Sequence, residues 1–166
     1  MKHRKTVGVA LCTLTLAAWA ATASATSLGV GVHYLHNLGD IKDAGLEDNS
    51  VSMVGSLQSG GTIKFEADLE YIFNYLGSDH AMVEPSVWAL IGGLVYGGAG
   101  IGIGHTDGEW QDHPFYALRA GLNFPLGGVG LDLFSTYRFQ KDEHINDVTG
   151  ESLDSITFGA MLRFGL

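Results

Sequence analysis

The sequence predicts an all-β fold, an eight-stranded antiparallel up-and-down transmembrane β-barrel. Three observations predict it: apolar and polar side chains alternate with a period of two, the alternation recurs in eight segments, and the connections between segments alternate in length. The 166-residue chain has 24 glycines and 3 prolines and the length of one domain. We therefore expect a single barrel domain over residues 26–166.

Residues 1–25 are predicted to be a cleaved signal peptide. A Lys-His-Arg-Lys segment at residues 2–5 precedes an apolar run at 7–20, and Ala-Ser-Ala at 23–25 has the small-x-small form of a cleavage site. A membrane anchor is the alternative, but the run is shorter than the roughly 20 residues of a spanning helix. Cleavage would remove the only cysteine and no acidic residue, so the acidic mature chain would lack disulfides, and nucleic acid is not an expected partner.

The clearest strand is predicted at residues 62–73. Apolar residues occupy every second position from Ile63 to Phe73, and polar or charged residues lie between them as far as Glu70. A strand separates two such sets onto opposite faces, whereas a helix would mix them. Seven further segments are phased in the same way and are close to the ~9–11 residues of a tilted membrane-spanning strand. They are residues 27–36, 49–58, 80–91, 94–104, 115–124, 129–140 and 153–166.

The predicted connections are short at one end of the barrel and longer at the other. The short links are residues 59–61, 92–93 and 125–128. The longer links are residues 37–48, 105–114 and 141–152, with 74–79 as a short exception at the same end. This is the pattern of outer-membrane barrels, in which the short turns and both chain ends lie in the periplasm.

Ionisable residues within the predicted strands fall on the face opposite the apolar one. Arg or Lys facing lipid near the middle of a bilayer costs ~2–4 kcal/mol, so this face is expected to line the lumen. Five carboxylates against four bases predict a paired network, because an unpaired buried charge is costly. This candidate site consists of Lys64, Glu66, Asp68, Glu70, Glu84, Arg119, Asp132, Arg138 and Arg163.

A soluble barrel would show the same alternation with the charged face in water, and a ligand-binding version of it is an alternative. The small residues Gly98, Gly100, Gly102 and Gly104 favour the membrane interpretation, because they would leave room in a narrow lumen for long Arg and Glu side chains. Aromatic residues near the strand ends are expected to form two girdles at the lipid interfaces. These are Tyr34, Tyr71, Phe73, Phe115, Tyr116, Tyr137 and Phe139 on the long-loop side, and Phe124 and Phe164 on the turn side.

With these features the chain resembles the small outer-membrane barrel families of the OmpA-transmembrane-domain and OmpX type. The resemblance covers nearly all of the mature chain, through the signal peptide, the glycine alternation at residues 96–104 and the final strand. It implies a Gram-negative outer membrane and assembly by the barrel-assembly machinery, which reads a terminal aromatic residue in these families. Here Leu166 takes that terminal position. The implied assembly signal is Phe158, Leu162, Phe164 and Leu166.

The expected role is structural, or surface interaction through the outer loops of a closed, charge-filled barrel surrounded by outer-membrane lipid and lipopolysaccharide. A monomer is expected. The alternative is a narrow porin-like channel for ions or small solutes. Neither an enzyme nor a cofactor is expected, since no Ser-His-carboxylate pattern appears. The acidic and histidine-containing residues 105–113 suggest a divalent cation, but a solvated loop is the simpler interpretation, so no metal site is assigned.

Overall fold

The structure is a computed structural model, and it describes residues 26–38, 47–77, 80–140 and 154–166. The predicted signal peptide lies outside the described residues. In the described part the chain forms eight long strands, one hairpin whose two strands have two residues each, and a short 3-10 helix, η2 (Tyr75–Gly77). The long strands are β1 (Thr26–Asn37), β2 (Asn49–Gly60), β3 (Ile63–Phe73), β4 (Met82–Gly92), β5 (Val95–Gly102), β8 (Phe115–Pro125), β9 (Val129–Phe139) and β10 (Ser155–Gly165). No helix in this part is long and apolar enough to cross a membrane.

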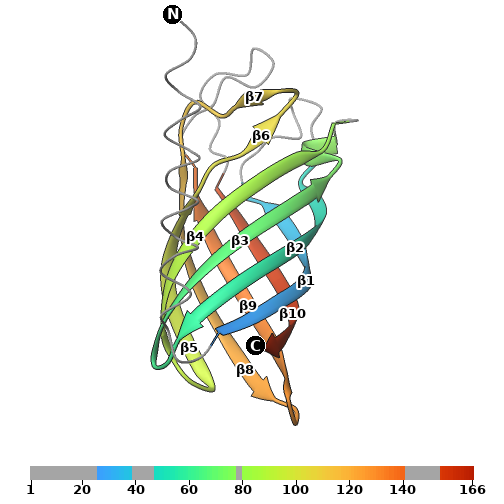
Figure 1. The fold of residues 1–166 in the computed structure, drawn as a ribbon. Helices are drawn as coiled ribbons and strands as arrows, with labels where there is room; N and C mark the ends of the chain where they lie inside the picture. Colours follow the sequence, from blue (N-terminus) through green and yellow to red (C-terminus); the bar gives the residue numbers. More distant parts are fainter. Residues whose placement is uncertain (1–25, 39–46, 78–79, 141–153) are drawn as a thin grey trace, which may run out of the picture.

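The eight long strands close into a barrel (Figure 1). Each pairs antiparallel with its neighbours in the order β3-β2-β1-β10-β9-β8-β5-β4, and β4 pairs back with β3. The first and last strands meet along their length, with Leu28 opposite Phe164. The Leu166 amide donates a hydrogen bond of 2.9 Å to the Thr26 carbonyl. Both ends of the barrel domain therefore lie at the same end of the barrel as the short turns. The predicted eight-stranded up-and-down barrel is confirmed.

The predicted strands match the observed ones to within a few residues, with one difference at the loop end. The strand expected at 94–104 ends at Gly102, and the loop expected at 105–114 contains the hairpin β6 (His105–Thr106) and β7 (Glu109–Trp110). Its turn is Asp107-Gly108, with positive φ angles of 52° and 83°. Asp-Gly is a strong signal for a two-residue hairpin turn when alternating segments flank it. Here no long alternating segments flank it, so the sequence pattern does not predict this hairpin.

The outer wall of the barrel is apolar and exposed. Val30, Met53, Leu69 and Tyr116, on four different strands, are 57–59% exposed. Each of the eight long strands carries at least one large exposed apolar side chain. Isolated exposed apolar residues are normal in soluble proteins, but an apolar belt to which every strand contributes is not.

The interior is packed by aromatic rings that lie over glycines of the neighbouring strand. Trp88 of β4 occupies the space a side chain at Gly100 of β5 would need, and Phe115 of β8 does the same at Gly102. The pattern repeats on the other strands of this wall, at Tyr96 over Gly121 and Phe134 over Gly159. Bulky and absent side chains therefore alternate across adjacent strands, which fills the narrow lumen.

Two sequence expectations about these residues are wrong. Gly98, Gly100 and Gly102 make room for Leu90, Trp88 and Phe115 in turn, and Gly104 for Met82 and Gln111, because the side chains nearest to these glycines are not Arg or Glu. Phe115, expected in the loop-side girdle, is only 1% exposed. It shares the inward phase of Ala117 and Arg119, and in a strand this phase decides the face.

Candidate functional site: the charged lumen

Eight of the nine predicted lumen residues are buried, and Lys64 is half-buried. The Lys64 ammonium lies 5.4 Å from the centre of the Tyr96 ring. The buried residues form two groups. The turn-side cluster consists of Glu66, Asp68, Arg119, Asp132 and Arg163, and the loop-side cluster of His33, Glu70, Glu84 and Arg138.

Glu66 is the centre of the turn-side cluster. Its Oε1 accepts a hydrogen bond from Arg119 Nη1 and its Oε2 from Arg163 Nη2, both at 2.7 Å. Arg119 Nη2 also donates to Asp68 at 3.0 Å, and Arg163 Nε donates to Asp132 at 2.8 Å. Two arginines and three carboxylates thus form a continuous chain of charge-assisted hydrogen bonds, which are stronger than neutral ones.

Neutral polar groups complete this cluster. The Tyr96 hydroxyl donates to Asp132 Oδ1 at 2.7 Å, and Gln58 Nε2 donates to Glu66 Oε2 at 2.6 Å. Arg163 Nη1 donates to the Ser56 hydroxyl at 3.1 Å. These bonds satisfy acceptors and donors that the ion pairs alone would leave unpaired in a low-dielectric interior.

Arg119 is also held by aromatic rings. Its guanidinium carbon lies 3.8 Å from the centre of the Trp88 ring and 4.4 Å from that of Phe134. Arginine stacks on aromatic faces because its planar cation is weakly hydrated and is attracted to the negative ring face. The side chain therefore has both its charge and its flat faces satisfied inside the barrel.

The loop-side cluster brings together two carboxylates, an arginine and a histidine. Glu70 of β3 and Glu84 of β4 are direct cross-strand neighbours. Arg138 donates to Glu84 and lies 3.9 Å from the centre of the Phe115 ring. Ser52 donates to Glu70, and His33 Nδ1 lies 3.1 Å from a Glu70 oxygen. Arg138 thus offsets charge that would otherwise repel across the β3–β4 ladder.

Most of the ion pairs join opposite walls of the barrel, whereas Arg163 and Asp132 lie on the adjacent strands β10 and β9. Four of the five predicted lumen carboxylates lie on β3 and β4, whereas the three lumen arginines lie on β8, β9 and β10. In the strand order, β3 is three strands away from both β8 and β10, so each pair to Glu66 crosses the lumen. Chemically this arrangement occupies the lumen and braces its walls.

Sequence reasoning found the charged members of the site but missed the neutral ones. Trp88, Tyr96, Phe134, Ser52 and Ser56 all have the inward phase and contact the charged groups. The period of two could have found them. Each side chain has the same inward phase as a predicted lumen residue on its own strand or on the strand paired with it. The predicted site contains ionisable residues only, so these neutral side chains lie outside it.

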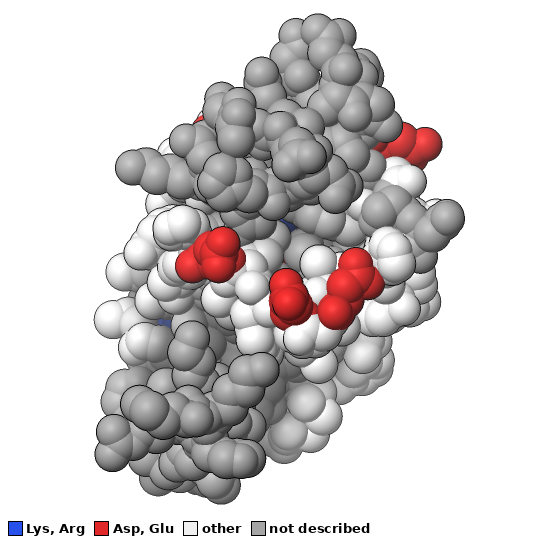
Figure 2. All heavy atoms as spheres, turned by 90° about the horizontal axis from the view of Figure 1, so that it is seen from above, with Lys and Arg blue, Asp and Glu red and all other residues white. Residues whose placement is uncertain are grey.

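The loop end carries acidic side chains. Figure 2 views the barrel from above and shows Asp and Glu on this surface, while Lys and Arg are almost hidden. The His80 Nδ1 atom lies 2.8 Å from Asp107, and the His105 ring packs against Trp110 with centres 4.8 Å apart. Within the described ranges, no three His, Cys, Asp or Glu side chains gather so that they could hold a metal ion.

The predicted assembly residues are all exposed on the outer side of β10 or directly after it: Phe158, Leu162, Phe164 and Leu166. Whether assembly machinery reads them stays a prediction.

A closed up-and-down barrel of eight strands, apolar outside and charged inside, defines the architecture of the small outer-membrane β-barrels. Among solved structures the chain is similar to Neisserial surface protein A, with 12% identity, 84% of this chain and 96% of that chain covered, and a TM-score of 0.63. It is also similar to a de novo designed transmembrane β-barrel, with 11% identity, coverage of 87% and 98%, and a TM-score of 0.52. At these identities the likeness is one of fold. No protein-family model and no curated protein matches the sequence.

Proposed function

We propose that this chain is an integral outer-membrane β-barrel protein of a Gram-negative cell envelope, with a rigid closed barrel that presents its outer loops as a contact surface. The observation that carries the proposal is the inverted distribution of side chains: large apolar residues are exposed on all eight long strands, while Arg119, Arg138 and Arg163 are buried. In water this arrangement would expose the apolar belt and desolvate the charges, whereas a bilayer requires it.

The same proposal includes an orientation and partners. The predicted signal peptide would deliver the chain across the inner membrane, and the short turns with both ends of the barrel domain would face the periplasm. The acidic loop end would then face outward among lipopolysaccharide, and the exposed face of β10 would be read during assembly. A single closed barrel has no open sheet edge to pair with another copy, which supports a monomer.

This proposal is tested by expressing the full chain in a Gram-negative host. We expect it to fractionate with the outer membrane and to migrate faster on a gel before boiling than after, because the folded barrel resists detergent. A chain recovered soluble from the periplasm would contradict the proposal, and the charged lumen residues would then need a different explanation.

The crossing ion pairs and the aromatic rings support a closed lumen rather than the narrow channel. We expect the purified barrel to give no steady conductance in planar lipid bilayers. Conductance in the wild type that disappears in the Arg138→Ala variant would instead favour a gated path through the loop-side cluster.

A further inference from the structure

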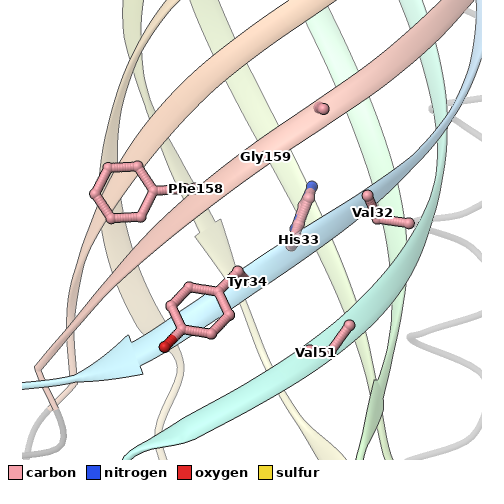
Figure 3. Close-up of a pocket in the computed structure, with 7 residues that line it drawn as sticks. Val32, His33, Tyr34, Val51, Phe158 and Gly159 are labelled. Atoms are coloured by element: carbon pink, nitrogen blue, oxygen red, sulfur yellow. The ribbon is translucent and has the colours of Figure 1, made fainter.

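An apolar groove lies on the outer wall where β1, β2 and β10 run side by side (Figure 3). It is an open hollow with a volume of about 320 Å³. The lining includes Val32, Tyr34, Val51, Phe158, Gly159 and Ala160. The groove therefore interrupts the belt that the proposed function places against lipid.

The depression arises from the sequence of β10. Phe158 and Tyr34 are direct cross-strand neighbours, and both rings stand about half exposed at the loop-side end of the groove. Gly159, the next residue of β10, faces the lumen beside the Phe134 ring, and the next outward residue is the small Ala160, which lies opposite Val32. The two large rings, followed on β10 by the small outward side chain of Ala160, leave a hollow in the outer wall.

The loop-side end of the groove carries polar groups. The Tyr34 hydroxyl donates a hydrogen bond of 2.7 Å to Asn49 Oδ1, and His36 Nδ1 lies 2.8 Å from the same oxygen. All three residues are at the loop end of β1 and β2, where the headgroup region would be. Hydroxyl, amide and imidazole groups can form hydrogen bonds with sugar hydroxyls and with the ester and amide carbonyls at the head of an acyl chain. In the proposed orientation this end of the barrel lies among lipopolysaccharide.

We propose that this groove holds one acyl chain of a lipopolysaccharide molecule, with its sugar end at Tyr34, His36 and Asn49. The inference rests on the proposed function, since only a membrane-embedded barrel would present the groove to such a lipid. A flexible apolar chain fits a groove with an apolar lining, and the polar end can bind the sugar hydroxyls and carbonyls where the acyl chain joins its headgroup. A second barrel would not fit, because its convex wall cannot enter a hollow behind the Tyr34 and Phe158 rings.

The test is native mass spectrometry of the full-length protein, extracted from outer membranes in a mild detergent. Ala160→Phe fills the groove, and Ala99→Phe makes the same change on the exposed outer face of β5, three strands from both β10 and β2. We expect one retained lipopolysaccharide on the wild type and on Ala99→Phe, and its loss from Ala160→Phe. Gel mobility before boiling confirms that all three barrels are folded.

The outcomes separate the groove from the proposed function. A folded wild-type barrel in the outer membrane that retains no lipid, or an Ala160→Phe variant that retains as much as the wild type, would overturn the groove alone. A retained adduct with the mass of a glycerophospholipid would overturn the choice of lipid. A wild-type chain found outside the membrane would overturn the proposed function and the groove with it.

Discussion

At the scale of single residues, Glu66 has the largest number of partners among the lumen carboxylates. Its two oxygens accept from arginines on β8 and β10, and Gln58 donates to one of them as well. A buried ion pair is weakly stabilising compared with an apolar replacement, because both charges lose their hydration. Loss of one partner is far more costly, since the remaining charges stay buried and unpaired.

We therefore expect Glu66→Ala to lower the free energy of unfolding by ~3–5 kcal/mol, the range for breaking a buried pair. Denaturant unfolding of the barrel in lipid vesicles measures the effect. Glu109→Ala removes an exposed carboxylate from β7 and is the matched control, with a change within about 0.5 kcal/mol. Equal unfolding of both variants and the wild type would show that the pairs to Arg119 and Arg163 do not brace the barrel.

At the scale of elements, adjacent strands interlock through rings placed over glycines. Such contacts lie between neighbours in the sheet, so they fix each strand in its register, because a slip of one residue would turn the ring outward. Trp88 over Gly100 joins β4 to β5, and Phe134 over Gly159 joins β9 to β10.

Gly100→Ala tests this interlocking. Its Cβ would collide with the Trp88 ring, and we expect a loss of ~1–3 kcal/mol of stability, as for an overpacked core. Gly55→Ala on β2 is the control, because its Cβ meets no atom within 4 Å, and here stability should hold or rise slightly. If Gly100→Ala unfolds like Gly55→Ala, the ring must have space to move, and register must depend on other contacts.

Much of the architecture could be predicted at this scale because a period of two is robust over long strands. Residues 62–73 show it so clearly that the face of Glu66 and Leu69 followed directly. The loop-end hairpin was missed because a two-residue strand is too short to show a period. The partners of each arginine were also out of reach, since Arg119 and Glu66 are 53 residues apart and only the closure of the barrel brings them together.

At the scale of the whole molecule, most lumen acids lie in the first half of the chain and the lumen arginines in the second, with Lys64 and Asp132 as the exceptions. Glu66, Asp68, Glu70 and Glu84 precede residue 92, and the three lumen arginines follow it. Neither half can neutralise its buried charges alone, so pairing requires that β1 meets β10 and β4 meets β3. The charge network thus depends on barrel closure, just as the closed wall depends on a filled lumen.

The central claim is that the apolar face of each strand meets lipid and the charged face does not. It is tested most directly by a spin-label scan along β9 in lipid vesicles, using single cysteines, since Cys12 lies in the predicted signal peptide and the mature chain has no other. Labels at Leu131, Leu133, Ser135 and Tyr137 should collide freely with oxygen, which concentrates in the bilayer, and labels at Gly130, Phe134 and Thr136 should collide little. Outward positions that are accessible to a water-soluble nickel chelate instead, or a scan without a period of two, would contradict the account.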